Sequence, residues 1–254
     1  MKRGRTFLAM LTIAVFIVGC ATAPKEPEKP LYSPTFDFAP PNSAAPNSAQ
    51  VSVAVVSPHF PESDWFRYRP YDYLRPNMEK DFIELLNAKG FTVRGPFKTR
   101  DEMTYPDKEG SDLVLIPDLE LQINDLVSPN EEGLIFTVYR LKGRVSVGGR
   151  LNLSLMEPLS GEKMWTKSID MPTKNVIIAT KKTWPKDQMP TRGPNGYVYL
   201  LAVDERVNSE VGKAVEDSYR EIMDATWKYL DPKELALIKE QCKKLREKIM
   251  IPGR

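Results

Sequence analysis

The sequence predicts an α+β fold: an antiparallel meander sheet covered on one face by helices, with two long helices at the C-terminus. Alternating apolar residues run through the middle of the chain, turn-forming residues separate those segments, and helix-period apolar stripes follow residue 205. Hydrophobic residues make up 41% of the chain, which is enough for a core. We therefore expect one domain over 51–254.

The N-terminus has the features of a lipoprotein signal peptide. A basic start precedes the apolar run 7–18, which ends in the lipobox Ile-Val-Gly-Cys at 17–20. That run is shorter than the roughly 20 apolar residues that a membrane-spanning helix needs. We expect removal of residues 1–19 and acylation of Cys20 with diacylglycerol and an amide-linked chain such as palmitate. The membrane would then be a partner through this lipid, since several acyl chains on one residue give stable anchoring.

Charge and cysteine content exclude two classes of protein. Removal of Lys2, Arg3 and Arg5 with the signal peptide changes the formal charge from +2 to −1. A nearly neutral chain is a poor partner for nucleic acid, whose binding depends on phosphate neutralisation. With Cys20 lipidated, Cys242 is the one remaining cysteine, so no intramolecular disulfide can form.

Residues 20–50 are dense in Pro, Ala, Ser and Asn and have no apolar period. They predict a lipidated, disordered tether that reaches at most about 90 Å from the membrane. Leu31, Tyr32, Phe36 and Phe38 are unusual in a plain spacer and leave open docking on the domain or on a neighbour.

The first part of the domain predicts strand, helix, strand and short helix. Residues 51–56 form the first strand, Asn77 caps a helix that Gly90 ends, and 91–93 form a short strand. The spacing of Thr99 and Glu102 indicates a capping box, with the short helix broken at Pro106.

Strands linked by hairpins should follow. Leu119, Leu121 and Ile123 share one face, and Pro117 demotes the start of this strand to an edge or a bulge. The cluster 128–133 predicts a turn, and Gly148-Gly149 the end of the strand 134–147. Further strands are expected at 150–155, with its three leucines on one face, and at 164–171.

The C-terminal region predicts two helices. Between 205 and 230 an apolar or small stripe is wide enough to pack on a sheet: Val207, Val211, Ala214, Val215, Ser218, Ile222, Ala225 and Tyr229. Asp231, Pro232 and Glu234 restart a helix as N-cap, first residue and capping-box partner. Its narrow seam is Leu235, Ile238, Cys242, Leu245 and Ile249. From 233 on, seven basic and three acidic residues give a basic outer face, which is either solvated or a contact for anionic headgroups or a partner helix.

Catalytic and metal-binding patterns are missing from the sequence. His59 is the single histidine, so it provides no histidine-pair metal site, and any Ser-His-Asp triad would need it. No nucleophile elbow, Walker loop, dinucleotide fingerprint or CxxC accompanies it. Cys242 lies in an apolar seam and is predicted to be a core residue. We expect no enzyme activity, catalytic residue, metal or cofactor.

The stretch 183–197 has no apolar period and predicts a long loop. Trp184, Arg192 and Tyr197 supply stacking and hydrogen-bonding groups that suit a glycan or a protein surface. The alternative is an insertion without a binding role.

Several motifs resemble the neuraminyllactose-binding haemagglutinin family of bacterial outer-membrane lipoproteins. They are the alternating leucines that lead into Glu157-Pro-Leu-Ser-Gly-Glu162, the start Gly133-Leu-Ile-Phe136 of the preceding strand, and Ile222-Met223 followed by a lysine-rich terminal helix. The resemblance is strongest at 150–171, and the lipobox agrees with it. It implies a non-enzymatic outer-membrane lipoprotein of adhesin type, surface-exposed or associated with a flagellar sheath.

One segment departs from the family. In the family's namesake, sialyl-glycan binding is attributed to a basic segment before the Gly-Leu-x-Phe start, whereas 125–132 here is acidic. Glutamates repel the carboxylate of sialic acid, so we transfer no sialic-acid site to this chain. Two hypotheses remain: a surface adhesin that binds a host glycan or protein, and a periplasm-facing accessory lipoprotein that docks on an envelope complex.

Overall fold

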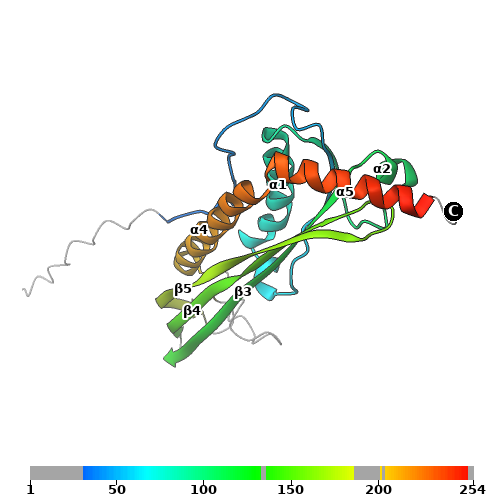
Figure 1. The fold of residues 1–254 in the computed structure, drawn as a ribbon. Helices are drawn as coiled ribbons and strands as arrows, with labels where there is room; N and C mark the ends of the chain where they lie inside the picture. The colour runs from blue at the N-terminus through cyan, green and yellow to red at the C-terminus, as the bar shows by residue number, and fades with distance from the viewer. Residues whose placement is uncertain (1–30, 133–135, 186–200, 202–203, 251–254) are drawn as a thin grey trace, which may run out of the picture. The chain divides into compact units, whose positions relative to one another are not determined.

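The computed structural model describes residues 31–132, 136–185, 201 and 204–250. Five strands form one sheet in the order β2-β1-β3-β4-β5 (Figure 1). The strands are β1 (Ser52–Val56), β2 (Thr92–Phe97), β3 (Leu113–Glu132), β4 (Phe136–Met156) and β5 (Lys163–Pro185).

The sheet is mixed, so the expectation of an antiparallel meander is wrong for its first part. β1 pairs in parallel with both β2 and β3, whereas β3, β4 and β5 pair antiparallel. Helical crossovers explain the parallel pairs: α1 (Leu74–Ala88) joins β1 to β2, and α2 (Tyr105–Glu109) joins β2 to β3.

The three antiparallel strands are longer than the sequence predicted. They contain 20, 21 and 23 residues, or roughly 65 to 75 Å each at about 3.3 Å per residue. Residues 128–132, expected in a turn, belong to β3, and Glu132 pairs with Val138. Residues 133–135, which connect β3 and β4, lie outside the described residues.

Gly148 and Gly149 do not end a strand; they form a bulge inside β4. The register with β5 shifts between Val147 and Gly149, and Gly149 has φ +152°. A Cβ atom on Gly149 would lie 2.0 Å from the carbonyl oxygen of Glu120 on β3. The glycine thus permits a close backbone approach, which is the usual meaning of glycine in a strand interior.

Pro117 does not place the start of β3 at an edge, because residues 113–115 lie between β1 and β4. Just beyond the end of β1, His59 replaces β1 as the backbone partner of β3. Its amide donates to the carbonyl of Pro117 at 3.0 Å, and its carbonyl accepts from the amide of Leu119 at 2.9 Å. Pro117 turns its own nitrogen toward the gap between β1 and His59, where a strand N–H would have no partner.

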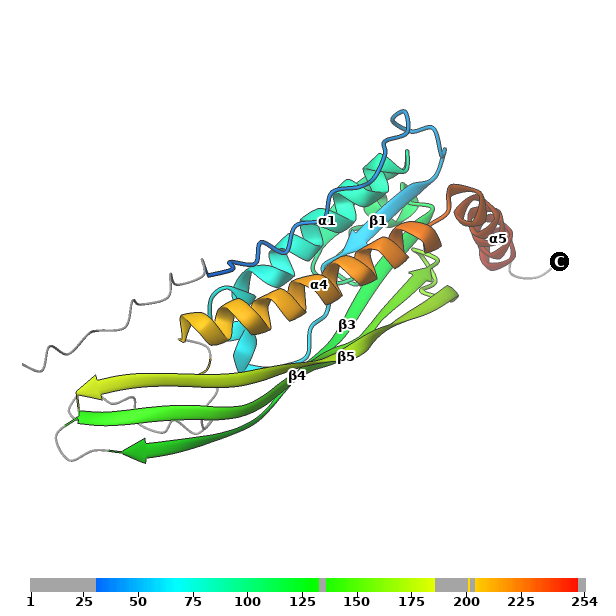
Figure 2. The same cartoon turned by 90° about the vertical axis from the view of Figure 1, so that its left-hand side faces the viewer.

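One face of the sheet carries the main core. Leu119, Leu121 and Ile123 are buried there as predicted, and so are the three leucines of 150–155. Helices α1 and α4 (Glu205–Tyr229) lie side by side over this face (Figure 2). The predicted α4 stripe is buried except for Ala225 and Tyr229, which are partly exposed. A smaller cluster covers the base of the opposite face: Ala54, Val56, Met103 and Val114.

Two helix starts differ from the expected ones. After the short 3-10 turns η1 (Asp64–Arg67) and η2 (Tyr71–Tyr73), α1 begins at Leu74, so Asn77 is inside the helix and not its cap. Thr104, not Thr99, caps α2 in a capping box with Asp107. Pro106 lies in the first turn of α2, where proline is tolerated because its N–H would be unpaired anyway.

Helix α5 (Pro232–Met250) starts as predicted, with Asp231 accepting from the amides of Lys233 and Glu234. Glu234 does not reach back to complete a capping box; it accepts a 2.8 Å hydrogen bond from Trp165 Nε1 of β5. Leu235, Ile238 and Cys242 are buried, which confirms the first part of the seam; Leu245 is partly exposed, and the burial of Ile249 is not described. Among the described residues no helix is long and apolar enough to span a membrane.

Candidate functional site

The segment 31–50, which we call the strap, packs along the domain between α1 and α4. Near its start, Asn77 Nδ2 of α1 donates to the carbonyl of Thr35 at 2.7 Å. Near its end, the amide of Ala44 donates to the carbonyl of Ala88 at 2.7 Å, and Lys239 Nζ of α5 donates to that of Gln50 at 2.6 Å. The strap therefore runs from the beginnings of α1 and α4 to the end of the domain that carries α5 (Figure 2).

The expectation of a disordered tether over 20–50 is therefore wrong for residues 31–50. Phe36 and Phe38 are 0% and 6% exposed, so they supply apolar burial that a spacer would not. The folded unit begins no later than Leu31. Of the four unusual residues in the spacer, these two phenylalanines dock on the domain, while Leu31 and Tyr32 remain partly exposed. Residues 20–30, with Cys20, lie outside the described part of the chain.

The strap is seated by alternating side chains. Pro34, Phe36 and Phe38 are buried, whereas Thr35 and Asp37 between them are exposed. The Phe36 ring lies 6.3 Å from the Tyr71 ring and 6.4 Å from the Tyr219 ring, centroid to centroid, the latter edge to face. Burial of a phenylalanine side chain contributes about 1.5 to 3 kcal/mol. The apolar contacts alone thus oppose detachment of this segment.

Two glycines make room for the strap. A Cβ atom on Gly212 of α4 would lie 2.8 Å from Pro34 Cγ. Gly90, at the end of α1, has φ +82°, and a Cβ atom there would lie 2.2 Å from Ser48 Oγ. Gly90 therefore ends α1, as predicted, and also allows the strap to pass close to it.

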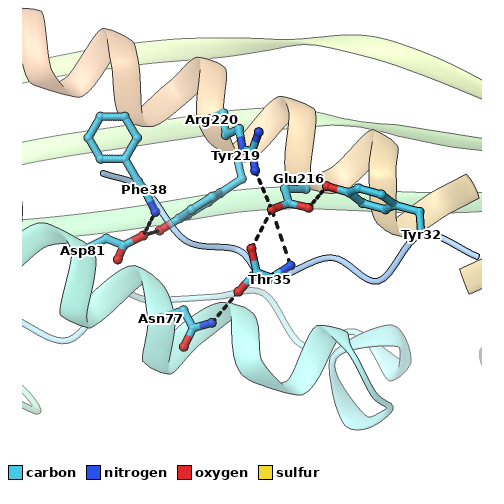
Figure 3. A network of polar contacts seen from close by, with 8 residues as sticks. All are labelled: Tyr32, Thr35, Phe38, Asn77, Asp81, Glu216, Tyr219 and Arg220. Atoms are coloured by element: carbon cyan, nitrogen blue, oxygen red, sulfur yellow. Dashed lines mark hydrogen bonds and ion pairs between the residues drawn. The ribbon is translucent and has the colours of Figure 1, made fainter. Parts of the chain in front are cut away.

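A buried carboxylate joins the strap to both helices (Figure 3). Asp81 Oδ2 of α1 accepts from the amide of Phe38 at 2.8 Å and from the hydroxyl of Tyr219 of α4 at 2.5 Å. Asp81 is fully buried, and burial raises its pKa to about 6, although these two hydrogen bonds act in the opposite direction.

A second carboxylate holds the beginning of the strap (Figure 3). Glu216 of α4 accepts hydrogen bonds from the hydroxyls of Tyr32 and Thr35, the latter at 3.0 Å, and forms an ion pair with Arg220 at 3.1 Å. Burial alone would raise the pKa of Glu216, but the hydrogen bonds and the nearby guanidinium outweigh it and lower the pKa. This carboxylate therefore stays ionised at neutral pH.

The motif 157–162 that carries the strongest family resemblance has a structural role. Glu157 is fully buried and accepts from Arg246 Nε of α5 at 2.6 Å and from the amide of Ser160 at 2.5 Å. Arg246 also donates to the carbonyl of Ser111 at 2.8 Å, just before β3. These bonds fasten α5 to the β4–β5 turn and to the start of β3.

The residues predicted for binding are not brought together within the described part of the chain. β5 extends through Pro185, and the backbone of Trp184 pairs with Thr137, so residues 183–185 are strand and not loop. Arg192 and Tyr197 lie outside the described residues. The structure thus leaves these three as predictions.

The geometry gives no support to a nucleophilic site at His59. Its Nδ1 lies 2.8 Å from Asp118 Oδ1, but the hydroxyl of the nearby Ser57 donates to Glu79 at 2.6 Å and not to the imidazole. Cys242 is buried, and burial raises the pKa of its thiol to about 11, which disfavours the reactive thiolate. Among the described residues no three His, Cys, Asp or Glu side chains cluster as a metal site.

Sequence reasoning missed Asp81, Glu216 and Tyr219. Each is an ordinary polar residue on a helix, and the three meet the strap only after α1 and α4 pack together. The available signal was the alternation of Pro34, Phe36 and Phe38, which is typical of an extended segment with one buried face.

No family model and no curated protein matches the chain. Among solved structures, the chain is similar to a neuraminyllactose-binding hemagglutinin homologue from Helicobacter pylori, with 19% identity, a TM-score of 0.58, and coverage of 84% of this chain and 99% of that one. A protein from Xanthomonas campestris, with 13% identity and a TM-score of 0.32, covers 85% of this chain and 99% of that chain. A lipoprotein from Neisseria meningitidis, with 14% identity and a TM-score of 0.26, covers 56% and 88%. The first likeness shows a shared fold, and the other two are too distant to support an argument.

Proposed function

We propose that this chain is a non-enzymatic, lipid-anchored lipoprotein of the bacterial outer membrane, of adhesin type, whose strap holds a binding domain close to the membrane. The lipobox at 17–20 supports the anchor. The fold shared with the hemagglutinin homologue supports the adhesin assignment. The packed strap is the observation that carries the proposal.

The strap sets the reach of the anchor. With Cys20 lipidated and Leu31 already seated on the domain, the ten residues 21–30 separate lipid and domain, and the eleven steps from Cys20 to Leu31 span at most about 40 Å at 3.6 Å per residue. A free tether to residue 50 would reach roughly twice as far. The domain is thereby held near the membrane surface.

The strap also orients the domain. Thr35 contacts the first half of α1 at one end, whereas Gln50 contacts Lys239 of α5 at the other. The chain enters the domain at the first end, whereas α5 and the β4–β5 turn lie at the other end of the strap. These elements are the surface that we expect a protein or glycan partner to meet. Sialic acid is not proposed as the ligand, because the family's basic segment is acidic here.

Protease treatment of intact cells tests this proposal, with a periplasmic protein as the lysis control. We expect external protease to remove the folded domain, and Cys20→Ala to move the protein from the membrane fraction to the soluble fraction. An unchanged membrane fraction in Cys20→Ala contradicts the anchor. Protection until the outer membrane is permeabilised contradicts surface display.

A periplasm-facing accessory lipoprotein is the second candidate, and the exposed side of α5 favours it. Leu237 is 69% exposed on this helix, whose exposed side carries more basic than acidic residues. An exposed apolar side chain on a basic helix suits an acidic, partly apolar protein surface. On this alternative, a photo-crosslinker at position 237 recovers one envelope protein from cells whose outer membrane protects the domain, and the same crosslinker at exposed Lys213 does not.

A further inference from the structure

A hollow of about 570 Å³ lies where the parallel strands β1 and β2 end, beside the beginning of β3. β1 ends at Val56 and β2 at Phe97, and Ser57, Lys98 and Ile116 of β3 line the hollow. The chain leaves these strands on opposite faces of the sheet: α1 packs on the main core, whereas Met103, on the path from β2 to β3, belongs to the small cluster on the other face. In parallel sheets, ligands bind outside the carboxyl ends of strands at such a switch point.

Basic side chains dominate the charged lining of the hollow. Arg75, Lys98 and Arg100 line it together with one acidic residue, Glu79. Arg75 is the second residue of α1, so the hollow lies beside the first turns of that helix. His59 also lines the hollow and bonds to Asp118, which places one more carboxylate beside it.

The interactions of these groups leave two cations available for a ligand. Glu79 is engaged by the hydroxyl of Ser57, and Arg100 donates to the carbonyls of Pro158 and Leu159. Lys98 has no ion-pair or hydrogen-bond partner among the described residues, and the guanidinium of Arg75 lies over the Phe60 ring, 5.3 Å from its centroid. Lys98, the first residue after β2, and Arg75 of α1 line the same space.

The floor of the hollow is apolar, formed by Val56, Pro58, Phe60 and Ile116. A volume of this size is typical of sites for small organic ligands, which combine apolar walls with a few convergent polar groups. We propose that this hollow binds a small organic anion, with a phosphate or carboxylate group between Lys98 and Arg75 and an apolar or aromatic body against Phe60 and Ile116. The site is independent of the membrane anchor and of the adhesin surface at α5.

Isothermal titration calorimetry on the full-length lipidated protein in a non-ionic detergent tests the site. The probe is phenyl phosphate, with inorganic phosphate and the cation benzamidine as matched ligands. The variants are Lys98→Gln and Arg75→Gln, and the control is Lys213→Gln, an exposed lysine on α4. Circular dichroism melting of each variant confirms that the fold is retained, and the exposure of both side chains makes these substitutions mild.

We expect saturable binding of phenyl phosphate, weaker binding of inorganic phosphate because it lacks the apolar body, and no binding of benzamidine. Lys98→Gln and Arg75→Gln should each weaken the affinity at least fivefold, and Lys213→Gln should not change it. Equal binding of benzamidine, or unchanged affinity in both site variants, overturns the proposal. So does a heat signal that appears only with vesicles containing phosphatidylglycerol, because the source of the anion would then be a lipid headgroup. Failure of phenyl phosphate, phenylacetate and benzoate alike to bind at millimolar concentration also overturns it.

Discussion

The hydroxyl of Tyr219 on α4 donates a 2.5 Å hydrogen bond to the carboxylate of Asp81 on α1, beneath the strap. The same carboxylate oxygen accepts a hydrogen bond from the amide of Phe38, so one buried atom joins two helices and the strap (Figure 3). The other oxygen, Oδ1, is buried without a hydrogen-bond partner among the described residues. Protonation at Oδ1 would therefore relieve a buried charge without breaking either bond.

The first prediction concerns this proton. Because burial raises the pKa of Asp81 from 3.8 to about 6, the folded state binds a proton more tightly than the unfolded state. The stabilisation that this tighter proton binding gives to the folded state is fully present below 3.8, the pKa in the unfolded state. It is lost as the pH rises through about 6, the pKa in the folded state. Urea denaturation at pH 5 and pH 7.5 should show a loss on the order of 1 kcal/mol over this range, because about one pKa unit of the shift lies above pH 5. Asp81→Asn, which keeps the shape but cannot ionise, should flatten that slope. Parallel pH profiles for the two proteins would contradict the assignment.

Phe36→Ala should destabilise the domain by about 3 kcal/mol, because it removes a fully buried ring and leaves a cavity beside Tyr71 and Tyr219. Denaturant unfolding of the full chain measures this change. Asp37→Ala, at the exposed neighbouring position, is the control and should change stability by less than about 0.5 kcal/mol. Equal effects of the two substitutions would mean that the strap is not part of the cooperative fold.

Gly212→Val should displace the strap without unfolding α4. The new side chain collides with Pro34, whereas valine in a helix is tolerated at a small cost in propensity. Limited proteolysis should then cut the variant between residues 31 and 50 at a protease concentration that leaves the wild type intact. Lys213→Val, at the next and exposed position of the same helix, should behave like the wild type. Resistance of Gly212→Val would show that the strap can shift without detaching.

The parts of the fold that depend on local pattern were predictable. Period-two leucines at 119–123 gave the buried face of β3, the α4 stripe gave its covering helix, and Gly90 and Asp231 gave helix ends. Glycine is common in tight turns and in β-bulges alike, so Gly148-Gly149 was predicted to end a strand although it forms a bulge. The strand-helix-strand pattern at 51–93 was the sequence feature that indicated the parallel pairing of β1. The longer pattern of antiparallel strands that follows outweighed it, so the sheet was predicted to be antiparallel.

The strap was missed because its amino-acid composition and its alternation of apolar residues predict different structures. Proline, alanine and serine predict a spacer, while Pro34, Phe36 and Phe38 alternate as in a strand with one buried face. The space between α1 and α4 decides between these two interpretations, and these helices begin more than 40 and 170 residues after the start of the strap. The sequence alone does not show that the two helices pack together there. The hollow at the strand ends was missed for the same reason. Arg75 and Lys98 are distant in the sequence, and only the folded sheet brings both into the lining of the hollow.

Cys242 should react slowly with a thiol reagent in the folded protein. Its side chain is 1% exposed, and burial raises the pKa of the thiol to about 11, so little thiolate is available at neutral pH. Leu237→Cys, at a position that is 69% exposed on the same helix, is the matched control for the rate. Labelling should become fast in denaturant. Rapid labelling of native Cys242 would mean that α5 detaches readily.

Arg246→Met should cost about 3 kcal/mol, because it leaves the carboxylate of Glu157 buried without its cation. Burial acts to raise the pKa of Glu157, and the hydrogen bonds from Ser160 and Arg246 outweigh it, so the pKa lies below its usual range. The wild type should keep this contribution above the usual pKa and lose it as pH falls through the lowered value. In Arg246→Met the loss should begin at a higher pH, which denaturant unfolding between pH 3 and pH 7 measures.

Two further variants separate the ion pair from simple packing. Lys244→Met, which removes an exposed cation from the same helix, should leave stability nearly unchanged. The double variant Glu157→Gln with Arg246→Met removes the charge that was left unpaired, so it should recover part of the lost stability. If the double variant is instead destabilised by the sum of the single effects, the two side chains do not act as a pair, and α5 must be held to the β4–β5 turn mainly by its apolar seam of Leu235, Ile238 and Cys242.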